Sequence, residues 1–228
     1  MSLPSTLVVC TRNLTTLLTT RIRPGHRVLE IGCAPGKLLA FANKVLGADV
    51  AGIDYSPNGV ATSKELFRAL GIDGDLRCED VFQTSLAPAY FDLVYSNGLI
   101  EHFDDPRPVV RKHVELARPG GRILIVVPNY GGVYGRIQGK LDPGNLAIHN
   151  LSIMSEEGMR RLVPQDLVRD HRIFYTGKLN PWIINLHTKV PRLLAQAINL
   201  AGNALGLMQP VVIKPLAPLI ALEMIRSD

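Results

Sequence analysis

The sequence predicts an α/β fold built on one open, mostly parallel sheet. Short apolar runs of strand length alternate with segments of helical period, as in parallel sheets whose crossovers are helices. The clearest unit runs from Arg27 to Leu39, where a buried strand passes through a glycine-bearing turn into a helix. The expected strands cover residues 28–31, 49–53, 76–78, 91–94, 122–129, 170–177 and 219–225.

Helices are expected between these strands, each with an apolar face or a recognisable terminal residue. They cover residues 5–22, 37–45, 57–70, 106–116, 154–162 and about 188–206. Ser56 and Ser155 are predicted N-caps, and Pro57 suits the first turn after Ser56. The helix over 5–22 either lies over a ligand cleft or covers an edge of the sheet; both alternatives stay open.

Two segments depart from this alternation. Residues 129–151 contain five glycines and one proline, which argues against a long regular element and predicts a functional loop after the fifth strand. Residues 179–215 are nearly free of charge. Core packing of the helix over 188–206 is the first expectation; an apolar lid, a dimer surface or a membrane-facing surface are the alternatives.

Composition describes a globular chain of 228 residues, 46% of them hydrophobic and 20% charged, with a formal net charge of +5. Lys and Arg are scattered, and no nucleic-acid-binding signature occurs, so no nucleic-acid partner is expected. Cys10, Cys33 and Cys78 lack metal-site spacing, which indicates a reducing compartment. No apolar run reaches the length of a spanning helix, so we expect a cytoplasmic protein, either a monomer or a homodimer.

The turn after the first strand is suited to a nucleotide. Glycine lets the backbone approach a ligand closely, and the N–H groups that begin the next helix point into the gap. A dinucleotide fingerprint would place glycines at 34 and 37, where Ala34 and Lys37 stand. Asp54 ends the second strand, where a carboxylate can accept both hydroxyls of a ribose.

This turn resembles motif I of the class I S-adenosylmethionine (SAM) methyltransferases, (D/E)-x-G-x-G-x-G. Glu30, Gly32 and Gly36 match that motif, and Ala34 replaces its middle glycine. Two more stretches resemble the small-molecule group of this family: F-D-L-V-Y-S followed by L-I-E-H over residues 91–102, and R-P-G-G-R-I over 118–123. The resemblance implies a Rossmann-like, seven-stranded, mostly parallel sheet with helices on both faces and the last strand antiparallel.

The same resemblance implies one methyltransferase domain over 1–228. Residues 1–26 would form a helical cover, 27–129 the SAM-binding core, and 130–228 the acceptor side. The cofactor would be SAM, with S-adenosylhomocysteine as its product. Asp80 would accept from the adenine amino group and the Val81 N–H would bond a ring nitrogen, with Glu79 as the competing acid. The implied cofactor contacts are Glu30, Gly32, Cys33, Ala34, Gly36, Asp54, Tyr55, Ser56, Asp80, Val81, Ser96, Asn97 and Gly98.

Methyl transfer needs a base only when the acceptor atom must lose a proton. His102 and His149 are the candidate bases, whereas His113 falls inside a helix and is expected on the surface. Some metal-assisted relatives carry E-x-x-E-H here, but Gly98 stands at the first acidic position, so no metal is expected.

The expected reaction is methyl transfer to an O, N or C atom of a small, hydrophobic metabolite. By analogy with the family this is a natural product, quinone, sugar or lipid-linked compound, and a peripheral membrane contact is an alternative. A non-catalytic nucleoside-binding domain is the competing class. An NAD(P)-dependent oxidoreductase is a second one, which shares Asp54 but lacks its glycine pattern here.

Overall fold

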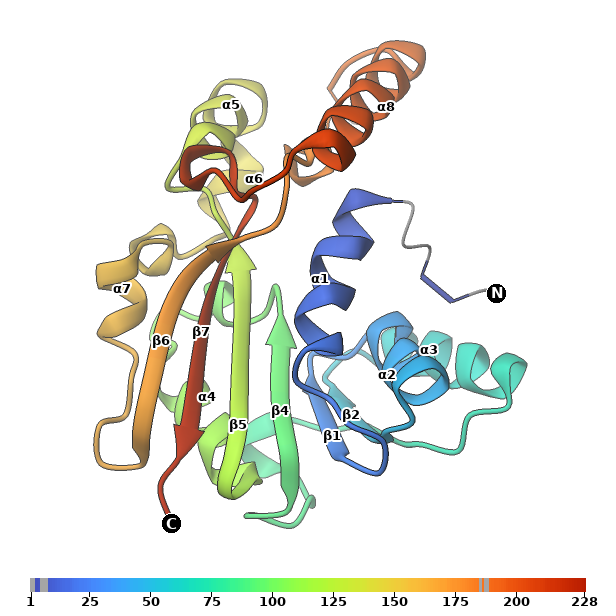
Figure 1. Cartoon of the computed structure of the whole chain (residues 1–228), viewed down its shortest axis with the longest axis vertical. Helices are drawn as coiled ribbons and strands as arrows, with labels where there is room; N and C mark the ends of the chain where they lie inside the picture. Colours follow the sequence, from blue (N-terminus) through green and yellow to red (C-terminus); the bar gives the residue numbers. More distant parts are fainter. Residues whose placement is uncertain (1–2, 5–7, 185, 187–188) are drawn as a thin grey trace.

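The computed structural model describes residues 3–4, 8–184, 186 and 189–228, and is organised around a twisted sheet (Figure 1). Over these residues the sheet has seven strands in the order β3-β2-β1-β4-β5-β7-β6. Strands β1 to β5 pair in parallel, and β7 runs antiparallel to both β5 and β6. The strands are β1 (Arg27–Ile31), β2 (Asp49–Asp54), β3 (Asp75–Cys78), β4 (Phe91–Asn97), β5 (Ala117–Pro128), β6 (Val168–Thr176) and β7 (Leu219–Arg226). The predicted fold class is confirmed.

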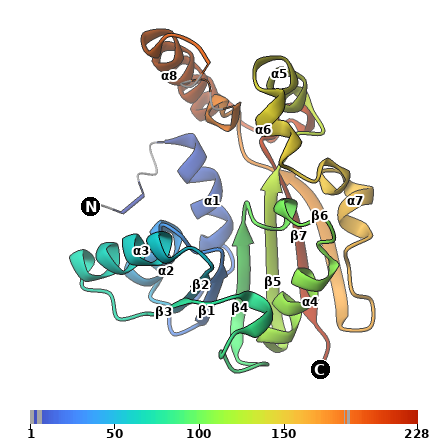
Figure 2. The same ribbon diagram turned by 180° about the vertical axis from the view of Figure 1, so that it is seen from behind.

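Helices cover both faces of the sheet (Figures 1 and 2). One face packs against α1 (Val9–Thr19), α2 (Lys37–Leu46) and α3 (Pro57–Leu70), and the other against α4 (Arg107–Leu116) and α7 (Glu156–Arg160). Alternate side chains of each strand serve the two cores: Val28 belongs to the first core and Leu29 to the second.

Local signals explain where several helices begin and end. The Ser56 hydroxyl accepts from the Gly59 N–H at 3.1 Å, and Pro57 occupies the first turn of α3. Gly71 ends α3 in the left-handed conformation, at φ 59°. Ser155 caps α7 in the same manner, accepting from the Gly158 N–H at 3.0 Å. Both predicted N-caps are confirmed.

A buried ion cluster joins the end of α1 to the edge of the sheet. Glu223 on β7 is 1% exposed and receives Arg21 at 2.8 Å, Arg172 from β6 at 2.7 Å, and Arg122 from β5. Burial tends to raise the pKa of the Glu223 carboxyl, but the three guanidinium groups outweigh this and hold it below its usual range.

Two expected boundaries differ clearly from the structure. Helix α1 ends at Thr19 rather than 22, and residues 5–7 of the expected helix lie outside the described residues. Strand β5 begins at Ala117, so the expected turn over 118–121 belongs to the strand, beside a register irregularity against β4. Pairing with β4 passes from Ala117 directly to Arg122, so residues 118–121 form an irregular stretch inside the strand, which side-chain pattern alone does not show.

The expectation of a loop without regular structure over 129–151 is wrong, because this segment contains α5 (Val133–Leu141) and α6 (Pro143–Ala147). Gly135 explains the difference: a Cβ there would collide with the Tyr130 carbonyl, so glycine lets the helix pack closely on the chain before it. Tyr134 then donates to the Leu216 carbonyl at 3.0 Å. Gly135 and Gly131 serve close packing rather than chain reversal.

The expectation that the helix over 188–206 packs into the core is also wrong. The helix there is α8 (Arg192–Met208), preceded by η4 (Pro181–Ile184) and followed by η6 (Lys214–Leu216). Its large apolar side chains are exposed, and Figure 1 shows the helix extending beyond the body of the sheet. Among the described residues, no helix combines the length and the hydropathy needed to cross a bilayer.

Candidate active site and cofactor cleft

Two hollows meet at Gly32, directly after β1 reaches the carboxyl edge of the sheet. The larger, about 430 Å³, extends past the ends of β2 and β3, and the smaller, about 190 Å³, extends toward α1 and the start of α2. Gly32 lines both and has φ 75°; a Cβ there would stand 3.2 Å from Leu99. Backbone conformation and space therefore both favour glycine. Ligands of open α/β sheets bind at this edge.

A third hollow, of about 350 Å³, lies at the opposite edge among the starts of β1 to β4, near Arg27, Asp49 and Asp75. The amino ends of parallel strands are not where such sheets bind ligands, so we place the site at the Gly32 edge.

Asp54 is fixed between the glycine-bearing turn after β1 and the start of α3. Its Oδ2 accepts from the Ala34 N–H at 3.0 Å, and its Oδ1 accepts from the Ser56 N–H at 2.8 Å. Each carboxylate oxygen has a second lone-pair direction, which leaves room for two ribose hydroxyls. Tyr55 stands at the rim of the larger hollow, 81% exposed, where a base could stack on it.

The structure distinguishes the two acids after β3. Glu79 accepts from the Thr84 hydroxyl at 2.8 Å and from the Ser85 N–H and hydroxyl at 2.9 and 2.6 Å. Its carboxylate therefore holds the following loop. Asp80 caps η1 (Val81–Gln83) through one oxygen, which accepts from the Phe82 N–H at 2.9 Å, and it lines the larger hollow with Val81. Asp80 is the better placed acceptor for an adenine amino group.

Glu30 provides an unpaired acid in the smaller hollow. It is 4% exposed, and its Oε2 has no hydrogen-bond partner within normal distance. Burial raises the pKa of the Glu30 carboxyl to about 8, Asp54 adds to the shift, and the neighbouring Tyr95 hydroxyl opposes it. A buried, unsatisfied carboxyl of this kind suits a ligand ammonium group.

The cleft thus fits S-adenosylmethionine in its donor set. A buried acid, Glu30, lines the smaller hollow, Gly32 stands where the two hollows meet, and two more acids, Asp54 and Asp80, line the larger one. Cys33, Ala34 and Asn97 line the smaller hollow as well. Burial raises the pKa of the Cys33 thiol, so this cysteine acts as a small apolar wall.

Four predicted contact residues have other roles in the described structure. Gly36 is the N-cap of α2, where a Cβ would stand 3.0 Å from Ser63, and Ser56 caps α3. Gly98 turns the chain after β4 with φ 68°. Ser96 is fully buried, with its hydroxyl bonded to His113, so its side chain is not presented to the cleft.

The expected surface position of His113 is wrong, because its ring is completely buried on α4. Nδ1 donates to the Val109 carbonyl at 2.7 Å, so Nε2 accepts from the Ser96 hydroxyl at 2.9 Å. Burial lowers the pKa of His113 to about 4, and the Val109 bond only partly opposes this. Its core position follows from the partner on β4, which helical period alone does not show.

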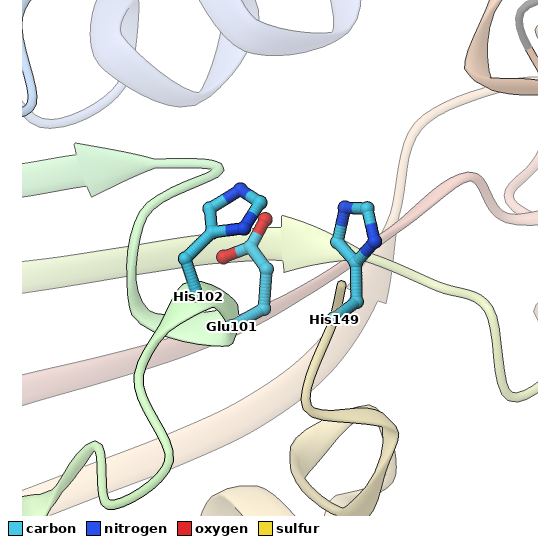
Figure 3. Close-up of side chains that lie close together, drawn as sticks. All are labelled: Glu101, His102 and His149. Atoms are coloured by element: carbon cyan, nitrogen blue, oxygen red, sulfur yellow. The ribbon is translucent and has the colours of Figure 1, made fainter. Parts of the chain in front are cut away.

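Glu101, His102 and His149 meet beside the larger hollow (Figure 3). The two imidazole centroids are 4.9 Å apart, and one ligand atom from each of the three side chains lies within 4.8 Å of the others. His102 and Glu101 come from η2 (Ile100–His102), whereas His149 follows α6. The Asn150 N–H donates to the Glu101 carbonyl at 2.7 Å and holds the two segments together.

His149 has a defined proton arrangement. Its Nδ1 lies 2.7 Å from the Asn145 carbonyl and must donate to it, which leaves Nε2 as the acceptor. Burial lowers the pKa of His149, and neighbouring His102 lowers it further. Tyr130 packs edge-on against the ring at 5.3 Å between centroids.

Glu101 is the residue that the sequence argument did not assign to the site. It is 1% exposed, its Oε2 lacks a partner, and burial raises the pKa of its carboxyl to about 7. Its position beside His102 in the L-I-E-H stretch was the available signal. The three donors could hold a divalent cation, and the expectation of no metal stays a prediction.

The family comparison agrees with this geometry. Residues 29–125 match the methyltransferase domain model, which covers β1 through most of β5. This stretch of the chain is a methyltransferase domain. This match and the class I fold support the predicted family and cofactor.

Curated relatives extend the match beyond this stretch. A ubiquinone biosynthesis O-methyltransferase of Xanthomonas euvesicatoria pv. vesicatoria is 28% identical over 162 residues, which are 71% of this chain and 62% of that protein. The chain therefore spans less than two thirds of this relative.

Solved structures show the same fold at lower identity. Phosphoethanolamine N-methyltransferase 2 of Haemonchus contortus, in complex with S-adenosyl-L-methionine, superposes with a TM-score of 0.64 at 17% identity, covering 95% of this chain and 52% of that one. YcgJ of Bacillus subtilis superposes with a TM-score of 0.62 at 18% identity, covering 95% and 99%.

Proposed function

We propose that this chain transfers the methyl group of S-adenosylmethionine to an oxygen of a small hydrophobic acceptor, with nitrogen or carbon as the alternative acceptor atoms. The observation that carries the proposal is the pair of hollows meeting at Gly32, with His102 on the wall of the larger one. The O-methyltransferase named for ubiquinone biosynthesis supports oxygen as the acceptor atom. A non-catalytic nucleoside-binding role is not favoured, because a paired histidine site adjoins the cleft.

The chain's own residues orient the cofactor. Glu30 would bind the ammonium group in the smaller hollow, and Asp54 the ribose hydroxyls. Asp80 and the Val81 N–H would bind the adenine. When bound, the cofactor supplies an electrophilic sulfonium methyl group, so the protein's contribution is orientation and exclusion of water.

The histidine pair would remove the acceptor proton. The Asn145 carbonyl fixes the Nδ1 proton of His149 and leaves Nε2 free to accept one. His102 lines the hollow directly, while Glu101 lies buried beside both rings. We assign His149 as the base and His102 as its partner at the acceptor.

Apolar side chains favour a hydrophobic acceptor. Leu99, Phe82 and Phe103 line the larger hollow, and the two phenyl rings pack edge to face at 6.1 Å. Tyr130 closes the side behind His149. These walls border the adenosine site in the same hollow, and they would also exclude water from an aromatic or alkyl acceptor lying beside His102.

We also propose that the acceptor side is built by residues 130–228, while 27–129 bind the cofactor and 1–26 cover it. Thr11 and Leu14 of α1 line the smaller hollow, which supports the covering role. A cytoplasmic location and a monomeric or homodimeric state are further parts of the proposal. The three cysteines are odd in number and lack metal-site spacing, which supports a reducing compartment.

The test is transfer of a radiolabelled methyl group from SAM to alkylated catechols and to their unalkylated parents. We expect turnover on the alkylated compounds, and His149→Ala should lower kcat about 10²-fold with an unchanged affinity for S-adenosylhomocysteine. His171→Ala, on β6 outside the histidine pair, is the matched control.

Two outcomes would contradict the proposal in different ways. Full turnover in the His102→Ala/His149→Ala double variant would remove the base assignment. Cofactor binding without transfer to any oxygen, nitrogen or carbon acceptor would favour the non-catalytic role.

A further inference from the structure

Helix α8 packs on the molecule through its smallest side chains. Its buried positions are Ala195, Asn199, Gly202 and Gly206, spaced by three or four residues. A Cβ at Gly202 would collide with Pro181, and one at Gly206 with the Leu179 carbonyl. The Val9 N–H donates to the Asn203 side chain at 2.8 Å, which ties α1 to this inner face.

The outer half of α8 carries the large apolar side chains. With about 100° of rotation per residue, the positions turned away from the buried stripe are apolar except for Gln196, which is exposed at the border of the stripe. The apolar positions are Leu193, Leu194, Ala197, Ile198, Leu200, Ala201, Ala204, Leu205, Leu207 and Met208. Leu193, Leu200 and Met208 are 81%, 73% and 79% exposed. A surface helix usually turns its large apolar side chains toward the core, whereas α8 turns them outward.

The apolar surface continues past the helix. Val211, Val212 and Ile213 are exposed directly after α8. We call the outer half of α8 together with residues 211–213 the crest. Figures 1 and 2 show α8 projecting beyond the carboxyl edge of the sheet, at the same end of the molecule as α5. Ile137 and Leu141 of α5 are exposed there as well.

The segment that contains the crest carries only positive charges. No Asp or Glu occurs from 171 to 222, whereas Lys178, Lys189, Arg192 and Lys214 flank α8 in sequence. Lys189 reaches Asp142 at 3.2 Å and Lys214 reaches Glu156 at 2.7 Å. The Lys214 pair is exposed and therefore contributes little energy, whereas Asp142 in the Lys189 pair is partly buried. The crest therefore combines a broad apolar face with a cationic border.

We propose that the crest docks on an anionic lipid bilayer, with α8 lying in the plane of the interface. An apolar arc half a turn wide suits insertion into the boundary between headgroups and acyl chains, and lysine and arginine stems can extend to anionic headgroups. A second copy of the chain is a poorer occupant. It would present the same cationic border and no acid between 171 and 222 to pair with it.

The full chain is tested by co-sedimentation with vesicles of phosphatidylcholine alone and of phosphatidylcholine with one quarter phosphatidylglycerol. We expect binding to the anionic vesicles that falls at least tenfold in 0.5 M NaCl, and weak binding to the neutral ones. Leu193→Gln/Leu200→Gln/Met208→Gln should lower binding at least tenfold. Val45→Gln replaces an exposed apolar residue of α2, away from the crest, and this control should bind as the parent does.

Affinity for S-adenosylhomocysteine shows that each variant is folded and keeps this test separate from the catalytic proposal. Absence of binding to anionic vesicles, equal binding to both vesicle types, or unchanged binding by the triple variant would each overturn the proposal. So would a dimer that dissociates in the triple variant, because the crest would then be a self-association surface.

Discussion

Asp54 accepts a hydrogen bond from the Ala34 N–H at 3.0 Å, which fastens the end of β2 to the turn after β1. The same carboxylate accepts from the Ser56 N–H at the start of α3. One side chain therefore joins the turn after β1 to the start of α3, and Asp54 itself lines the larger hollow. Ala34, which replaces the middle glycine of motif I, donates the first of these hydrogen bonds through its backbone N–H. Its side-chain methyl group does not prevent the bond.

Replacing Asp54 with Ala should lower the affinity for S-adenosylhomocysteine by about 1.5–3 kcal/mol, because hydrogen bonds to a charged acceptor are lost. Isothermal titration calorimetry measures the change. Asp49→Ala, at the exposed opposite end of the same strand, is the matched control and should bind normally. Unchanged affinity in the Asp54 variant would contradict the placement of the ribose.

The two acids after β3 should separate in the same assay. Asp80→Asn should weaken cofactor binding, whereas Glu79→Gln should leave it within about twofold, because Glu79 bonds to Thr84 and Ser85. Glu79→Gln should instead lower the melting temperature. The opposite pattern in binding would show that the adenine contacts Glu79.

Glu30 should make stability fall as pH rises. Its pKa is raised to about 8 in the folded protein, so between about 4.5 and 8 the folded state holds a proton that the unfolded state has lost. The free energy of unfolding should decrease with pH across this window, by up to about 1.4 kcal/mol per pH unit. Urea titrations should show a flatter profile for Glu30→Gln, and equal slopes in both proteins would oppose burial of a protonated Glu30.

Cofactor binding should also release a proton from Glu30 near pH 7, because a ligand ammonium group favours the carboxylate. Calorimetry in buffers of different ionisation enthalpy measures that release. Its disappearance in Glu30→Gln is expected; identical proton release in both proteins would place the ammonium group elsewhere.

His113 should produce the opposite slope at lower pH. Its pKa is lowered to about 4, so between about 4 and 6.5 the unfolded state binds a proton that the folded state excludes, and stability rises with pH. The acid limb of the urea-titration profile should flatten in His113→Gln. An unaltered limb would mean that other groups dominate acid unfolding.

Glu223 should be important for folding. Glu223→Gln leaves Arg21 buried without its charged partner and should cost about 3–5 kcal/mol. Glu157→Gln, which loses only the exposed pair with Arg161, is the control and should cost under about 1 kcal/mol. Chemical denaturation compares the two; equal effects would show that the cluster contributes no more than a surface pair.

The sequence predicted the regular part of the fold because strand alternation, caps and turn glycines are local signals. Ser56, Ser155 and Gly71 act in the structure as local chemistry predicts. The errors arose where a tertiary partner decides the outcome. Gly135 serves a close approach to Tyr130 inside a helix, and Ser96 draws His113 into the core.

The site was predicted to a similar extent. The cleft residues Glu30, Gly32, Asp54 and Asp80 follow from the ends of strands, and the structure places them around two joined hollows. The meeting of His102 with His149 could not follow from spacing, because it depends on how α6 folds back beside η2. The reversed polarity of α8 was hidden for a related reason: periodicity gives the width of an apolar face but not which side is buried.

Calorimetric titration of the purified chain with S-adenosylhomocysteine, and separately with NAD(H), tests the central claim most directly. Micromolar binding of S-adenosylhomocysteine and none of NAD(H) is the predicted result. Binding of NAD(H) alone would contradict the assignment of the Gly32 cleft to S-adenosylmethionine.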